Sequence, residues 1–124
     1  GYLAERFSDK GSTITRIAGD ELLRLASSER DAGAIARSIQ LYDMFFEYYP
    51  THYNAAVQAF SLGARAVKQE DWELAARFYG HIANLYTNHT SYASALHSLS
   101  VCYDKMGNEA EYEKYKNNFR NHFW

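Results

Sequence analysis

The sequence predicts an all-α protein built from three helix-turn-helix repeats. Two positive observations support this expectation: apolar residues recur at helical spacing, and the same apolar pattern returns after 37 residues. In addition, no segment shows the sustained apolar–polar alternation of a half-buried strand. We expect one domain over residues 1–124, with repeats of about 15–51, 52–88 and 89–124.

The repeat is visible as seven columns of similar residues when the chain is shifted by 37 positions. The columns hold Leu22, Ala59 and Leu96; Leu25, Leu62 and Leu99; Ala26, Gly63 and Ser100; Ser38 and Ala75; Tyr42 and Tyr79; Phe45, Ile82 and Phe119; and Tyr49, Tyr86 and Phe123. One matching column would arise by chance, whereas seven columns in one register indicate an internal repeat.

Each repeat is expected to contain two helices. The expected helices lie near residues 14–29, 33–48, 53–68, 72–86, 91–106 and 109–122, with a short helical turn before them at Tyr2–Phe7. In the first repeat, Pro50 marks a helix end, because the residue before a proline is driven away from helical dihedral angles. Thr51 and Thr90 are candidate caps for the helices that follow them.

Helix boundaries in the second and third repeats follow from their end residues. Asp71 is a candidate N-cap for the return helix of the second repeat. In the third repeat, Gly107 supplies a C-terminal stop, and Asn108 with Glu111 three residues later resembles a capping box.

The second repeat carries a likeness to a known family. Leu62, Gly63, Ala66, Ala75, Tyr79 and Ile82 stand at the spacing of the tetratricopeptide repeat (TPR) signature, which the chain therefore resembles. The first repeat matches through Leu25, Ala26, Tyr42, Phe45, Tyr49 and Pro50, and the third through Leu99, Tyr103 and Gly107. Tyr112 and Lys116 depart from the pattern, which indicates a degenerate terminal repeat. The resemblance implies a right-handed α-solenoid with a concave groove lined by the first helix of each pair.

That resemblance also implies which residues face the groove and bind protein. They are Leu23, Val57, Phe60, Ala64, Lys68, Ser94, His97, Val101 and Lys105. Phe60 heads this set, because it lies off the packing stripe formed by Ala59 and Leu62. It is either an aromatic anchor for a partner or a residue packed between repeats, and the sequence leaves both readings open.

The expected function is non-enzymatic binding of a partner peptide or protein surface in this groove. One alternative is a TPR-type secretion chaperone that holds an aggregation-prone client. The other is a self-assembling structural subunit, in which Phe123, Trp124 and the Tyr2–Phe7 segment meet between copies. The 37-residue period and the Tyr49-Pro50 ending resemble TPR proteins of the bacterial envelope, namely the lipoprotein subunit of the outer-membrane β-barrel assembly machine and the Tol–Pal-associated periplasmic protein. This favours the periplasm or cell envelope over the cytoplasm.

Composition and motifs argue against several other classes. Thirteen basic and fifteen acidic side chains give a net charge of −2, so no electrostatic footprint for nucleic acid is expected. The longest segment without charged residues, 78–103, is too rich in His, Ser, Asn and Thr for a membrane span. His81, His89 and His97 lack metal-site spacing, and Cys102 is expected to be a packed thiol. Since no glycine-rich phosphate loop or nucleophile elbow is present either, we expect no metal, no cofactor and no catalysis.

The aromatic residues separate into two sets. Eleven lie in columns of the repeat and are expected in the core: Tyr42, Phe45, Tyr49, Trp72, Tyr79, Tyr86, Tyr92, Tyr103, Tyr112, Phe119 and Phe123. Nine lie outside the columns and are candidate contacts with partners: Tyr2, Phe7, Phe46, Tyr48, Tyr53, Phe60, Phe78, Tyr115 and Trp124.

Overall fold

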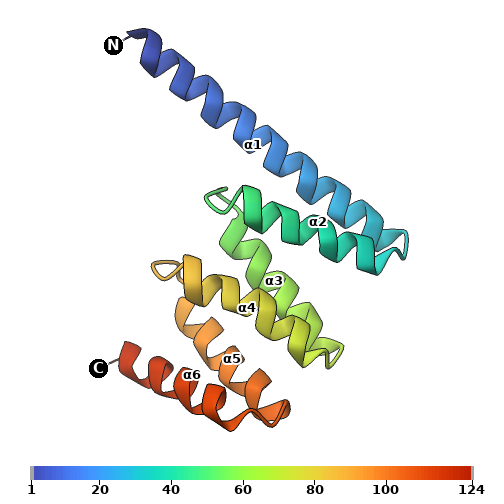
Figure 1. Cartoon of the computed structure of the whole chain (residues 1–124), viewed down its shortest axis with the longest axis vertical. Helices are drawn as coiled ribbons and strands as arrows, with labels where there is room; N and C mark the ends of the chain where they lie inside the picture. Colours follow the sequence, from blue (N-terminus) through green and yellow to red (C-terminus); the bar gives the residue numbers. More distant parts are fainter. Residues whose placement is uncertain (1, 124) are drawn as a thin grey trace. The chain divides into compact units, whose positions relative to one another are not determined.

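The computed structural model describes the backbone of residues 2–123 and the side chains of residues 14–123, and it confirms the all-α prediction. This part of the chain forms helices without any strand (Figure 1). The helices are α1 (Tyr2–Asp31), α2 (Ile35–Tyr48), α3 (Ala55–Lys68), α4 (Trp72–Leu85), α5 (Tyr92–Lys105) and α6 (Glu109–His122). No helix found among the described residues is both long enough and apolar enough to cross a membrane. Trp124 and the side chains of Tyr2 and Phe7 lie outside the described part.

The first helix differs from the prediction. A short turn at 2–7 and a separate helix at 14–29 were expected, whereas α1 is one continuous helix of 30 residues. A glycine such as Gly11 lowers helix propensity by only about 1 kcal/mol relative to alanine, which the surrounding helical residues outweigh.

The helix boundaries confirm the 37-residue period. Helices α2, α4 and α6 begin at residues 35, 72 and 109, and α3 and α5 begin at residues 55 and 92. Two of the expected caps are also confirmed, because the side chains of Asp71 and Asn108 accept hydrogen bonds from the backbone N–H groups of Leu74 and Glu111.

The turn inside each repeat also recurs. Residues 33, 70 and 107 all adopt positive φ angles, of 85° in Gly33, 58° in Glu70 and 73° in Gly107. Each turn is closed in the same way by a backbone hydrogen bond that spans five residues, for example from the Asp71 N–H to the Ala66 carbonyl. This is the Schellman arrangement, in which glycine is the preferred residue at the left-handed position.

Replacing Glu70 with glycine is therefore expected to stabilise the protein. The left-handed conformation costs a non-glycine residue roughly 1–2 kcal/mol, and glycine's larger unfolded-state entropy offsets part of that gain. We expect the free energy of unfolding, measured by urea denaturation, to rise by about 1 kcal/mol. The matched control, Gly107→Ala, is expected to lower it by a similar amount. A neutral or destabilising Glu70→Gly would contradict this account.

The loops between repeats contain a pair of histidines that the sequence reasoning missed. His52 and His89 lie 37 residues apart, and the Nδ1 atom of each accepts a hydrogen bond from the backbone N–H two residues later, at 3.1 Å in both loops. Each carbonyl oxygen then accepts a bond from the first residue of the next helix, Ala55 or Tyr92. The prediction that Thr51 and Thr90 cap these helices is wrong, because the helices begin later and the imidazoles bond to the loop.

The chain divides into two compact units, Gly1–Ala55 and Ala56–Trp124, which are described separately. In the first unit α1 packs against α2. Ala26, Tyr42, Phe45 and Phe46 form the buried core of this pair. The Tyr42 hydroxyl lies 3.1 Å from Ser27 Oγ, and the buried Ser38 hydroxyl donates a hydrogen bond to the carbonyl of Ala26 at 2.7 Å.

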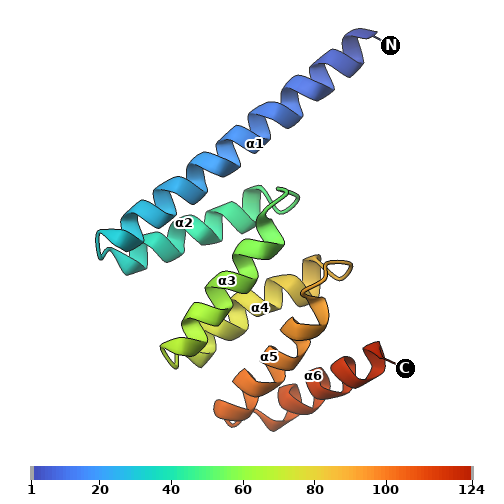
Figure 2. The same cartoon turned by 180° about the vertical axis from the view of Figure 1, so that it is seen from behind.

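In the second unit, α4 packs against α5 and α5 against α6. Figures 1 and 2 show α3 and α5 on one side of this unit and α4 and α6 on the other. Gly63 allows α3 to approach α4 closely, because a Cβ atom at this position would lie 2.9 Å from the Tyr79 ring. The buried core includes Leu62, Ala75, Phe78, Tyr79, Ile82, Leu96, Leu99 and Cys102.

Burial of the aromatic residues corrects the predicted division. Phe46, Phe78 and Tyr115 were placed among candidate partner contacts, yet they are buried, with exposed fractions of 3%, 1% and 9%. Phe78 and Tyr115 are themselves 37 residues apart, so the repeat register contained a core column that was overlooked. Phe123 was expected in the core but is 64% exposed, because it follows the end of α6 where no described element covers it.

Candidate functional site

The predicted groove residues on α3 form an accessible stripe. Val57 is 50% exposed, Phe60 is half-buried, and Ala64 is exposed, as is Lys68 at the C-terminal end of the helix. We call Val57, Phe60 and Ala64 the α3 outer stripe. Another stripe of the same helix, which contains Ala59, Leu62 and Ala66, is buried.

Phe60 packs against its own repeat and keeps part of its side chain accessible. Its ring meets the Tyr79 ring edge to face, with centroids 5.5 Å apart and an interplanar angle of 76°. This contact supports the same ring that approaches Gly63. The side chain is therefore held within the second unit, and only part of it faces solvent.

The predicted residues on α5 do not all lie against the same neighbours. The His97 ring lies 5.5 Å from the Phe119 ring of α6, whereas Lys105 Nζ lies 5.9 Å from the Trp72 ring at the start of α4. Ser94 is exposed and Val101 half-buried. Leu23, the remaining predicted residue, is half-buried on α1 in the first unit.

A hollow of about 520 Å³ lies between α5 and α6. His97 and Val101 from the predicted set line it, together with Ser100, Asp104, Tyr112, Lys116, Phe119, Arg120 and Phe123. The sequence analysis gave no binding role to Tyr112, Lys116, Phe119 and Arg120, and gave Phe123 one only in the self-assembly alternative. The signal that was available is the register, which aligns Lys116 and Phe119 with the core residues Tyr79 and Ile82.

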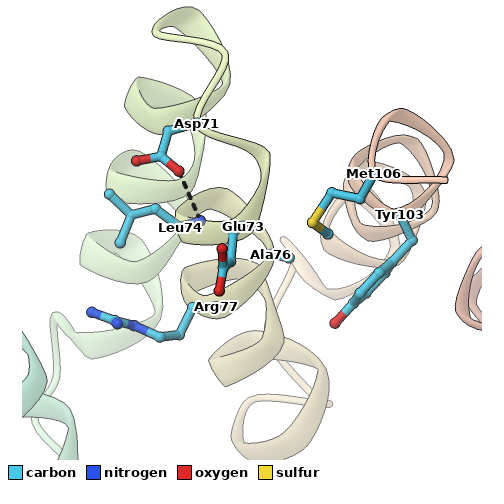
Figure 3. A pocket seen from close by; sticks show the side chains of 7 residues that line it. All are labelled: Asp71, Glu73, Leu74, Ala76, Arg77, Tyr103 and Met106. Carbon is cyan, nitrogen blue, oxygen red and sulfur yellow. Dashed lines mark hydrogen bonds between the residues drawn. The ribbon is translucent and has the colours of Figure 1, made fainter. Parts of the chain in front are cut away.

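A second hollow, of about 650 Å³, lies between the start of α4 and the end of α5 (Figure 3). Asp71 already accepts the hydrogen bond from Leu74 that caps α4, and it points away from Tyr103 and Met106. The Tyr103 ring stacks on that of Tyr115 with centroids 5.7 Å apart, and burial raises the pKa of the Tyr103 hydroxyl. No nucleophile–base pair is assembled by the residues that line this hollow.

The single cysteine has the character of a core residue. Cys102 is fully buried, and this burial raises the pKa of its thiol to about 11. The thiolate is the reactive form of cysteine, so the group is held in its unreactive form at neutral pH. In the part of the chain that the structure describes, no three His, Cys, Asp or Glu side chains are grouped so as to hold a metal ion.

Comparison with protein-family models, curated proteins and solved structures gives no match. No family is shown. What the chain binds is therefore inferred from its own residues. These lie in the α3 outer stripe and around the α5/α6 hollow.

Proposed function

We propose that the chain is a non-enzymatic protein-interaction module of the TPR type, whose three helix pairs stack as a right-handed solenoid. It binds a peptide or protein surface through the α3 outer stripe. The observation that carries this proposal is that Val57, Phe60 and Ala64, which follow one another along one side of α3, are apolar and accessible. The recurrence of helix boundaries and turns at 37 residues supports the repeat architecture.

Leaving this apolar stripe exposed to water is unfavourable. Apolar surface removed from water contributes about 25 cal/mol per Å² to association. A helix that is apolar on both a buried and an accessible side offers such surface without first unfolding. Phe60, fixed against Tyr79, gives the stripe a rigid aromatic centre, and rigid anchors lose little conformational entropy on binding. A bacterial envelope assembly is the setting that the 37-residue period favours.

The test uses exposed positions so that the fold is preserved. Val57→Glu and Ala64→Glu place carboxylates on the stripe, whereas Phe60 is left intact because it supports Tyr79. The matched control is Leu85→Glu on α4, because Leu85 is 52% exposed, close to the 50% of Val57. Immobilised protein is used to recover partners from an extract of the source cells, after circular dichroism has confirmed that each variant is helical.

We expect the two stripe variants to reduce recovery of the bound partner by at least about tenfold, which corresponds to 1.4 kcal/mol of binding free energy. The Leu85→Glu control should recover the same partner as the unmodified chain. Undiminished recovery by folded stripe variants would refute binding at the stripe. Sedimentation at several concentrations distinguishes partner binding from self-assembly, because a self-assembling subunit changes its mass with concentration.

A further inference from the structure

The α5/α6 hollow occupies the repeat positions that are covered in the preceding repeat. Tyr79 and Ile82 of α4 are 3% and 0% exposed where α4 packs against α5. The residues 37 positions later on α6 are Lys116 and Phe119, and both remain partly exposed. Phe123, the counterpart of Tyr86, is 64% exposed. Among the described residues, the second unit thus shows the same kind of surface once covered and once open.

In the preceding repeat, the helix that covers the corresponding surface of α4 shows what kind of element fits it. The cover is α5, a helix of 14 residues that runs antiparallel to α4 (Figure 1) and whose buried residues include Ala95, Leu99 and Cys102. A hydrogen bond links Ser98 of α5 to the Tyr79 hydroxyl. An amphipathic helix of similar length, with small and aliphatic residues on its inner face, is therefore expected to fit the open surface.

Charge distinguishes the open surface from the covered one. The α4 positions occupied by Tyr79 and Ala83 are uncharged, whereas their counterparts on α6 are Lys116 and Arg120, one helical turn apart. Within the described chain neither cation is paired with a carboxylate, and Lys116 Nζ lies 5.3 Å from the Tyr112 ring. Asp104, the single acidic residue that lines the hollow, lies on α5.

A neutral helix placed over this surface would remove water from the two cations without supplying a carboxylate in its place. Burying an uncompensated charge is strongly unfavourable, whereas a carboxylate within hydrogen-bond distance offsets much of that cost. Complementary charge also selects among partners that share the same apolar pattern. The surface is therefore matched to an acidic helix and mismatched to a basic one.

We propose that the α5/α6 hollow docks an amphipathic helix of a partner protein that carries two carboxylates one turn apart. The carboxylates meet Lys116 and Arg120, and the apolar face of the helix covers Val101, Phe119 and Phe123. This docking does not depend on the α3 outer stripe.

The probes for the test are two synthetic helical peptides based on the α5 sequence Tyr92–Lys105. In one, Ser94 and Ser98 are replaced by glutamate, and in the other by lysine. Ser98 is the residue that bonds to Tyr79, and Ser94 lies four residues earlier on the same side of α5. Both peptides carry Cys102→Ala and a side-chain lactam on the outer face, because an isolated helix of this length is marginally stable. Binding to the whole chain is measured by fluorescence polarisation.

We expect the glutamate peptide to bind at least about tenfold more tightly than the lysine peptide, with the difference shrinking as salt is raised. In the double variant Lys116→Glu/Arg120→Glu the preference should reverse in favour of the lysine peptide. The matched control is Lys114→Glu, which makes the same charge change on α6 at a residue that pairs with Glu111 and does not line the hollow. It should change either affinity by no more than about twofold.

Three results would overturn the proposal: equal affinity for the two peptides, no binding of either, or a glutamate preference that survives in the double variant. Self-association of the chain that the Lys116→Glu/Arg120→Glu variant abolishes would also overturn it, because the occupant would then be a second copy. The proposed function is tested separately, since Val57→Glu and Ala64→Glu should leave the affinity for the glutamate peptide unchanged.

Discussion

Phe78→Ala is expected to lower the free energy of unfolding by about 3–5 kcal/mol, because it removes a large aromatic ring from a packed core. Phe78 is 1% exposed on α4. The surrounding helices relax only partly around such a deletion, so the lost burial and the remaining cavity both contribute. Urea denaturation followed by far-ultraviolet circular dichroism, which reports helix content, measures the change. The slope of the transition shows whether unfolding remains two-state.

The matched control is Phe123→Ala, which removes the same side chain from a residue that is 64% exposed. It should change the free energy of unfolding by no more than about 0.5 kcal/mol. If Phe78→Ala leaves too little folded protein to measure, Phe78→Leu retains most of the volume and should cost less than about 1.5 kcal/mol. Equal effects of the two alanine substitutions would show that the assigned burial is wrong.

Gly19→Ala is expected to destabilise the first unit by about 1–3 kcal/mol, the range typical of overpacking. A Cβ atom at residue 19 would lie 2.5 Å from Cδ2 of His52, whose side chain is 1% exposed. The imidazole has little freedom to move away. Its Nδ1 accepts the Asn54 N–H, so its proton is on Nε2, which donates to Asp20 at 2.7 Å. The ring also packs edge-on against Phe45, with centroids 5.1 Å apart.

A double-mutant cycle identifies the clash as the cause. In a His52→Ala background, Gly19→Ala should be neutral or stabilising by up to about 1 kcal/mol, because alanine is the better helix former once the ring is gone. Thermal and urea denaturation of the four proteins provide the coupling energy. An identical cost of Gly19→Ala in both backgrounds would mean that the imidazole does not limit this position.

The register of the chain was predictable because it depends on local interactions. Helical spacing of apolar residues, the Asp71 and Asn108 caps and the Gly107 turn each act within a few residues of the backbone. The five helices after α1 therefore begin and end within about two residues of the predicted positions, which is the usual uncertainty of helix ends. The same local reasoning failed at α1. A break was predicted between residues 7 and 14, whereas the helix continues through them.

The candidate site was only partly predictable, because exposure depends on which helices pack together. The sequence identified the nine groove residues by position alone. The structure places Val57 and Ala64 on an accessible face, brings His97 and Val101 to a hollow shared with α6, and sends Lys105 to Trp72. Nothing in the local pattern distinguishes these outcomes.

By itself, the sequence determined the all-α class, the 37-residue period and the Gly107 turn, since these are set by neighbours along the chain. Only the tertiary structure decided that Phe78 is buried while Phe123 is exposed, and that His52 bonds to Asp20, which lies 32 residues earlier in the chain. It also decided that Lys116 and Arg120 border an open surface. The physical reason is that burial and pairing arise from contacts between residues far apart in sequence, and no single repeat contains that information.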